Sequence, residues 1–126
     1  YILENPSVFS WLCQQYPEKS FVCTNGQLRF SAFVLLDHLS RTSDLFYSGD
    51  HDPEGLLIAQ KLKKYYQGFL EYWHMTEEDY RKSRSEEVIS EKRLKILDHI
   101  TDPELREVAD AVSKYKTAGY QEKIFE

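Results

Sequence analysis

The chain has 126 residues, of which 41% are hydrophobic and 29% are charged, which is typical of one compact globular domain. Its 16 lysines and arginines are outnumbered by 21 aspartates and glutamates, so it lacks the basic surplus that marks a domain binding duplex DNA by charge alone. No apolar run reaches the ~18 residues of a membrane-spanning helix and no signal peptide is visible, so we expect a cytoplasmic protein without a membrane partner.

The first part of the chain alternates between short strand-like runs and helical patterns. Strands are predicted at the short apolar or β-branched runs of residues 1–3, 20–24, 45–48 and 69–73. Helices are predicted where apolar residues recur at helical spacing, over about residues 7–16, 30–39 and 56–66. This alternation predicts a Rossmann-like α/β fold, with a mainly parallel four-stranded sheet and helices on both faces.

From Thr76 onward the pattern becomes helical. A short helix is predicted over residues 76–83, opened by a capping box with Asp79 in its last position. The polar residues 83–87 are predicted to be mobile. Ser90 is expected to cap a further helix that reaches about His99.

The last helix is predicted to open at Thr101-Asp102-Pro103 and to continue past Gly119. Residues 76–126 are therefore expected to form a helical extension packed on an α/β core of residues 1–75. We expect the two parts to make one domain. Because the first strand starts at residue 1, we also expect the chain to be a fragment of a longer protein.

Polar residues follow each of the first three predicted strands. Glu4 follows the first strand, Asn25-Gly26 follows the second, and Asp50-His51-Asp52 follows the third. Ligands bind to such folds outside the carboxyl ends of the strands. We therefore expect Glu4, Asp50 and Asp52 to lie at the same edge of the sheet, with His51 pointing away from its two neighbours.

Carboxylates held close together repel one another, and each raises the pKa of the others. A hard divalent cation removes this conflict, and Mg²⁺ is commonly held by one or two carboxylates together with water and phosphate oxygens. The three acids therefore predict a Mg²⁺ site, which Mn²⁺ can also occupy. Such a site can activate a water or stabilise charge on a phosphodiester.

Residues around the acids fit the same interpretation. Pro53 and Gly55 are predicted to shape the turn into the following helix, whose N-terminal N–H groups suit a phosphate. Other flanking residues are candidates for contacts to phosphate or to the metal ligands: Asn5, Asn25, Gly26, His51 and Glu54. Each also has a structural explanation, such as helix capping, turn formation or a favourable acidic residue in a first helical turn.

Three ordered motifs, Ile2-Leu3-Glu4, Thr24-Asn25-Gly26 and the segment from Gly49 to Gly55, resemble those of the Toprim domain shared by topoisomerases, bacterial primases and several nucleases. The D-x-D-P-x-G form is similar to that of the A subunit of type IIB topoisomerases and of the JetD nuclease subunit. The whole chain resembles a Toprim-like C-terminal domain of largely uncharacterised bacterial proteins.

The resemblance implies roles for individual residues. Glu4 would be a metal ligand or the general acid/base, and Asp50 and Asp52 would be Mg²⁺ ligands. Glu54 would assist through a water. The implied activity is Mg²⁺-dependent cleavage of phosphodiesters, with DNA as the partner and its contacts made through other domains of the parent protein.

The expected reaction is hydrolysis by a metal-activated water, because no tyrosine matches the nucleophile of topoisomerases. Two alternatives stay open. The first is a non-catalytic Toprim-like module that binds nucleic acid or a partner protein. The second is a phosphatase-like acidic α/β site, although such phosphatases carry D-x-D after the first strand rather than the third.

Overall fold

The computed structural model describes residues 1–125. At its centre lies a four-stranded sheet, made of β1 (Ile2–Leu3), β2 (Val22–Cys23), β3 (Leu45–Ser48) and β4 (Leu70–Tyr72). The spatial order is β2-β1-β3-β4, and neighbouring strands are parallel throughout. The predicted α/β class with a parallel four-stranded sheet is therefore confirmed.

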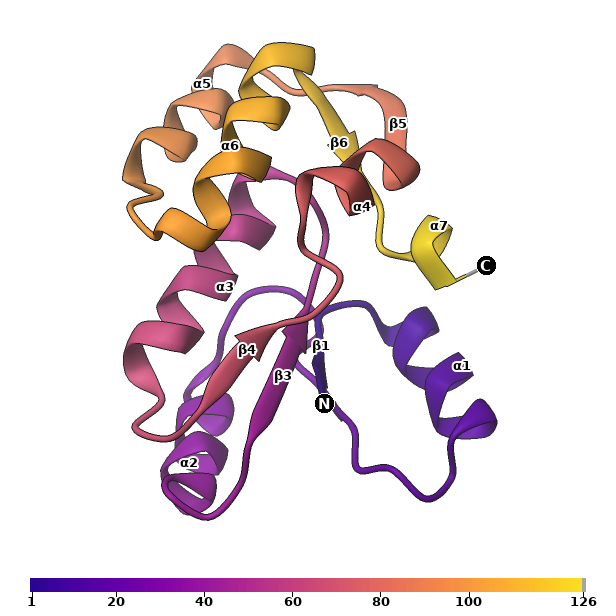
Figure 1. The fold of residues 1–126 in the computed structure, drawn as a ribbon, viewed down its shortest axis with the longest axis vertical. Coiled ribbons are helices and arrows are strands. Elements are labelled where there is room, and N and C mark those ends of the chain that lie inside the picture. Colours follow the sequence, from indigo (N-terminus) through magenta and orange to yellow (C-terminus); the bar gives the residue numbers. More distant parts are fainter. Residues whose placement is uncertain (126) are drawn as a thin grey trace.

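Helices cover both faces of this sheet (Figure 1). They are α1 (Pro6–Gln15), α2 (Phe30–Leu39) and α3 (Pro53–Tyr65). The helices α2 and α3 pack in one buried cluster with Ile2 and Tyr47, whereas α1 packs in a second cluster with Leu3. Successive strand residues point to opposite faces, which is why Ile2 and Leu3 belong to different clusters.

Two helices begin at side chains that also lie at the carboxyl edge of the sheet. Asn5 caps α1, because its Oδ1 accepts hydrogen bonds from the N–H groups of Ser7 and Val8. Asp52 caps α3, with its Oδ1 accepting from the N–H of Gly55 at 2.7 Å. A proline occupies the first turn of each helix, as the sequence predicts.

The second part of the chain contains helices and a small sheet. Its elements are α4 (Glu77–Ser83), β5 (Arg84–Val88), α5 (Glu91–Leu94), a 3₁₀ helix η1 (Lys95–His99), α6 (Pro103–Tyr115), β6 (Thr117–Gly119) and α7 (Glu122–Phe125). The capping box of Thr76 and Asp79 is confirmed, and so is the cap at Ser90.

Two predictions for this part are wrong. Residues 83–87 are not a mobile segment, because β5 pairs with β6 in an antiparallel ladder. The last helix does not continue past Gly119, because α6 ends where Lys116 adopts the left-handed conformation with φ 58°. The chain then enters β6, which supplies hydrogen bonds to the polar strand β5.

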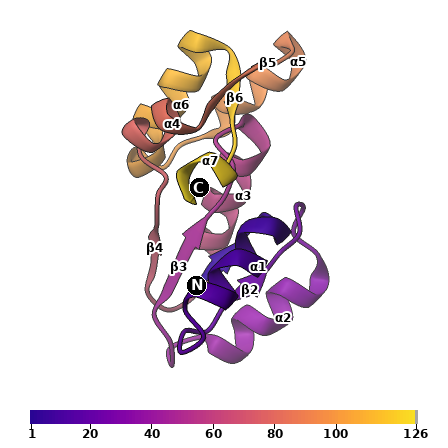
Figure 2. The same cartoon turned by 90° about the vertical axis from the view of Figure 1, so that its right-hand side faces the viewer.

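The strand β6 also ties the extension to the main sheet. His51 and Gly119 exchange backbone hydrogen bonds of 2.8 and 2.9 Å, directly after β3. The chain therefore returns to the carboxyl edge of the sheet, and α7 lies beside α1 (Figures 1 and 2). Leu105 and Val108 of α6 belong to the same buried cluster as Tyr47 of β3.

None of the helices described in residues 1–125 combines the length and the apolar character needed to cross a membrane.

Candidate functional site

Glu4 and Asp50 meet where the strand order reverses. The chain leaves β1 toward β2 on one side of the sheet and leaves β3 toward β4 on the other. In open α/β sheets ligands bind at such a switch point, outside the carboxyl ends of the strands. Glu4 follows β1 and Asp50 lies two residues after β3, and the N–H of Asp50 donates to Oε2 of Glu4 at 3.2 Å.

Gly49 allows this close approach. A side chain at position 49 would place its Cβ 2.8 Å from Oε2 of Glu4 and 2.7 Å from the hydroxyl of Tyr47. Tyr47 is fully buried beneath the acids, and burial together with the charge of Glu4 raises its pKa well above the ordinary value. The hydroxyl of Tyr47 has no hydrogen-bond partner among the described residues.

The two central acids hold their protons unusually tightly. Burial, followed by repulsion from Asp50, raises the pKa of Glu4 to about 7. Burial also raises the pKa of Asp50 to about 6, against the opposing effect of the hydrogen bond that its Oδ1 accepts from the N–H of Gln121 at 2.8 Å. Near neutral pH Asp50 is therefore mostly ionised, whereas Glu4 still keeps its proton in part of the molecules.

Asp52 faces a different set of partners. Its Oδ1 caps α3, and its Oδ2 lies 3.1 Å from Nη2 of Arg93. Arg93 also donates two hydrogen bonds of 2.8 Å to the carboxylate of Glu54, which lowers the pKa of Glu54. Asp52 itself has a raised pKa, chiefly because it is buried. Arg93 thus brings a positive charge from α5 to the acidic edge.

A further acid comes from α7. Oε1 of Glu122 accepts a hydrogen bond of 2.6 Å from Nδ2 of Asn5, and the charge of Glu122 contributes to the raised pKa of Asp50. Oε2 of Glu122 is buried and has no hydrogen-bond partner within residues 1–125. The same holds for both polar atoms of the buried Gln121 side chain.

The other predicted site residues are placed as follows. His51 is fully buried, and its Nδ1 lies 3.0 Å from Oγ of Ser83, so the imidazole points into the extension. Burial lowers its pKa to about 4, which keeps the ring neutral. The turn at Asn25 and Gly26 has left-handed backbone at both residues, and the hydrogen bonds described for residues 1–125 do not link it to the acids.

Pro53 and Gly55 shape the start of α3. Pro53 occupies the first turn of the helix and is buried. A Cβ at position 55 would overlap the carbonyl oxygen of Asp50, so only glycine allows the helix to pass this close to the acidic loop. Gly55 therefore fixes the distance between α3 and the backbone of Asp50.

The donor set suits magnesium only in part. Within residues 1–125 no three His, Cys, Asp or Glu side chains are placed so that they could hold a metal ion together. Asp52 is directed toward Gly55 and Arg93 instead of toward Glu4. Magnesium, however, needs only one or two carboxylates when water and phosphate complete its shell. Glu4 and Asp50 supply two carboxylates at this edge, and Oε2 of Glu122, whose charge acts on Asp50, is a further buried oxygen without a partner in residues 1–125 that could accept a hydrogen bond from a hydrated cation.

Comparison with known proteins identifies a family but no function. A family model described as "Protein of unknown function C-terminus (DUF2399)" matches residues 1–126. The chain belongs to this family. No curated protein and no solved structure gives a significant match to it.

Sequence reasoning missed three residues of this site: Arg93, Gln121 and Glu122. Each comes from the extension and contacts a residue of the acidic edge that is 39 or more positions away in the sequence: Glu54, Asp50 and Asn5, respectively. None of them lies in a recognisable motif. The sequence does offer one indication that the extension returns to the acidic edge: Gly119, since a glycine in a strand commonly marks close approach of another backbone.

Proposed function

We propose that this chain is a Toprim-like metal-binding domain that takes part in Mg²⁺-dependent cleavage of phosphodiester bonds in DNA. The observation that carries the proposal is the hydrogen bond of 3.2 Å from the backbone N–H of Asp50 to Oε2 of Glu4, which brings these two acids together at the switch point of the sheet. Burial raises the pKa of both acids, and the charge of Asp50 raises that of Glu4 further, so a divalent cation bound beside them would favour their ionised forms.

Glu4 and Asp50 are the proposed ligands of Mg²⁺, with Mn²⁺ as a substitute. Asp52 can join them only by leaving Arg93, to which it is bound at 3.1 Å. A magnesium ion bound here would stabilise charge on a phosphate oxygen and increase the acidity of a bound water.

The protein groups around the cation have distinct tasks in this proposal. Glu4 is either a ligand of the cation or the general acid/base: in the metal-free chain its pKa of about 7 allows it to accept or release a proton near neutral pH, and direct binding of the cation would lower that pKa. Arg93 presents a guanidinium that is one-third exposed, which is suitable for contact with a phosphate oxygen. Glu54 holds that guanidinium by two hydrogen bonds and so acts as a positioning residue.

Cleavage of DNA in the presence of metal is the experiment that tests this proposal. The chain is incubated with a single-stranded oligonucleotide and with supercoiled plasmid, in Mg²⁺, in Mn²⁺ and in EDTA. We expect metal-dependent cleavage that is lost in Glu4→Gln and Asp50→Asn and kept in Glu18→Gln, which alters an exposed acid between α1 and β2. Absence of cleavage in either metal would refute catalysis by this chain.

Two other results would redirect the assignment. Binding of metal and DNA without cleavage would identify a non-catalytic Toprim-like module. Hydrolysis of small phosphoesters without cleavage of DNA would identify a phosphatase-like site. A location in the cytoplasm, and contact with DNA through further domains of a longer protein, belong to the same proposal.

A further inference from the structure

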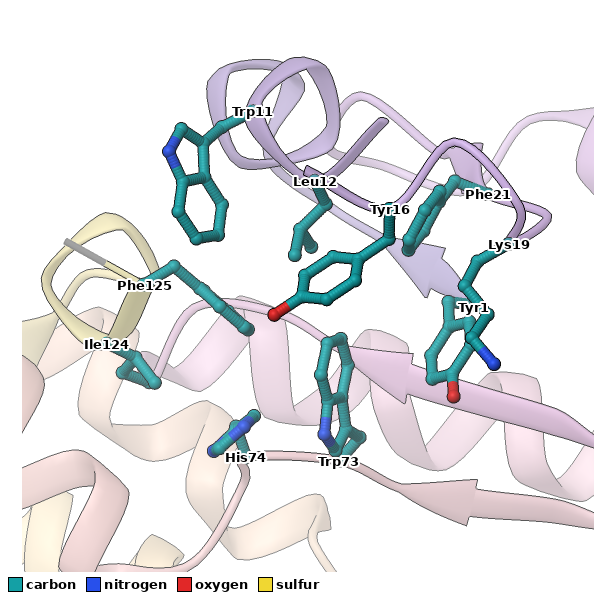
Figure 3. Close-up of a pocket in the computed structure, with 10 residues that line it drawn as sticks. All are labelled: Tyr1, Trp11, Leu12, Tyr16, Lys19, Phe21, Trp73, His74, Ile124 and Phe125. Atoms are coloured by element: carbon teal, nitrogen blue, oxygen red, sulfur yellow. The ribbon is translucent and has the colours of Figure 1, made fainter. Parts of the chain in front are cut away.

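A pocket of about 330 Å³ opens between α1 and the end of β4, on the face of the sheet that α1 covers. Its wall is mostly aromatic (Figure 3), and its lining residues include Trp11, Tyr16, Phe21, Trp73 and Phe125. Figure 3 shows Trp11 and Tyr16 reaching down from the α1 side toward Trp73 and Phe125. Both tryptophans of the chain therefore line this one pocket.

The aromatic rings are close together, yet part of their surface stays open. The rings of Trp73 and Phe125 have centroids 5.2 Å apart, and those of Trp11 and Phe125 are 6.5 Å apart. Trp11 remains 42% exposed and Tyr16 48% exposed. Exposed apolar surface gathered in one hollow is typical of a binding site, whereas single exposed residues are not.

The helix α7 links this pocket to the acidic site. Phe125 lines the pocket, and Glu122, on the same short helix, contacts Asn5 beside the acids. A second hollow of about 180 Å³ shares Trp11 and Phe125 with the first, and Glu122 is also among its lining residues. The two hollows therefore lead from the aromatic rings to Glu122, which the hydrogen bond to Asn5 places next to the residue that follows Glu4 in the acidic edge.

We infer that the pocket receives an unstacked base of the single strand whose phosphodiester lies at the acidic edge, an inference that rests on the proposed function. Every base has a flat π-face that stacks on Trp, Tyr or Phe, and this contribution does not depend on sequence. The ammonium of Lys19 also lines the pocket and provides a positive charge for a neighbouring phosphate.

The charge of the chain favours this occupant over a duplex. With a net charge of -5, the domain gains less affinity from phosphate contacts than a basic domain does, and Lys19 provides one such contact at the pocket. Stacking supplies affinity without basic residues. It also requires a base that has left the helix, which selects a single strand or a locally opened one.

The test uses the two tryptophans as reporters, in metal-free buffer so that cleavage plays no part. The chain is titrated with an oligothymidylate and with an abasic sugar–phosphate oligomer of the same length. We expect the oligothymidylate alone to quench tryptophan fluorescence. We also expect it to bind about 5- to 150-fold more tightly than the abasic oligomer, the range that one base–aromatic stack is worth.

Variants assign the effect to the pocket, with binding followed by the anisotropy of a labelled oligothymidylate. Trp73→Ala and the milder Tyr16→Ser should both bring its affinity down toward that of the abasic oligomer. Phe30→Ser serves as the matched control and should bind like the wild type, because Phe30 is 83% exposed on α2 and does not line the pocket.

Equal affinity for the two oligomers, with unchanged fluorescence, would overturn the inference. Metal-dependent cleavage together with that result would leave the proposed activity standing and remove only the base pocket. Quenching by the oligothymidylate without any cleavage would support the pocket and remove the nuclease proposal instead.

Discussion

The backbone N–H of Asp50 donates a hydrogen bond to Oε2 of Glu4 over 3.2 Å, and so joins the ends of β1 and β3. The bond orients the Glu4 carboxylate, and it also brings Asp50 close enough for its charge to disfavour the ionised form of Glu4. This one contact therefore holds the acids in place and makes their joint ionisation unfavourable in the absence of a cation.

The raised pKa of Asp50 should make the metal-free protein less stable as pH rises. The pKa of Asp50 is raised from its usual 3.8 to about 6 by folding. Between these values the unfolded chain releases a proton that the folded chain still holds, so the free energy of unfolding falls as pH rises. Asp50→Asn removes this loss, and it keeps an acceptor for the N–H of Gln121.

In EDTA, wild type and Asp50→Asn should differ least below about pH 4. Above about pH 7 the variant should be more stable by roughly 1–3 kcal/mol. Urea denaturation at a series of pH values measures this difference. His51, with a pKa lowered to about 4, changes stability in the opposite sense over the same range, but it is present in both proteins and cancels. A constant difference at all pH values would contradict the raised pKa.

Gly55→Ala should disturb the acidic loop as well as the fold. The added Cβ would overlap the carbonyl oxygen of Asp50, so α3 or the loop must move. We expect a loss of about 2–4 kcal/mol in the free energy of unfolding, together with weaker Mg²⁺ binding.

Gly26→Ala is the matched control, because Gly26 has φ 88° but nothing lies within 4 Å of its added Cβ. It should cost about 1–2 kcal/mol through backbone conformation alone and leave Mg²⁺ binding unchanged. Chemical denaturation and calorimetry of both variants test the comparison. Equal loss of metal binding in the two variants would show that Gly55 has no special part in shaping the site.

Arg93→Ala should leave two acids without their cation. Arg93 lowers the pKa of Asp52 and of Glu54, so its removal should raise both values. We expect a loss of about 1–2 kcal/mol in stability at neutral pH. The control is Arg81→Ala, since the Arg81 pair with Glu77 lies on the exposed surface of α4 and its loss should matter less. Thermal unfolding that ranks Arg81→Ala as the more harmful change would contradict the role given to Arg93.

The sequence predicts the sheet well because its signals are local. Each of the first three strands is followed by a polar residue or turn, and Asn5-Pro6 and Asp52-Pro53 open helices by capping chemistry contained within four residues. The positions of Glu4 and Asp50 at one edge follow from the parallel order of the strands. These parts of the fold can be predicted without knowing which distant segments contact each other.

The extension was predicted less well because its structure depends on pairing between distant segments. Residues 84–88 are mostly exposed and polar, and they form a strand only because β6 lies beside them. The return of the chain from Lys116 to the acidic edge requires the His51–Gly119 bridge, and a glycine at position 119 does not by itself identify His51 as its partner. Glu122 and Arg93 reach the acids as a consequence of that long-range arrangement.

Isothermal titration calorimetry of Mg²⁺ at pH 7.5 tests the central claim, that Glu4 and Asp50 together form a cation site. We predict saturable binding by the wild type and by Glu18→Gln. A fraction of a proton should be released on binding, because Glu4, with a pKa of about 7, is partly protonated at pH 7.5, whereas Asp50, with a pKa of about 6, is already ionised. Glu4→Gln and Asp50→Asn should each abolish the binding. Undiminished binding by both variants, or no binding by the wild type, would contradict the account.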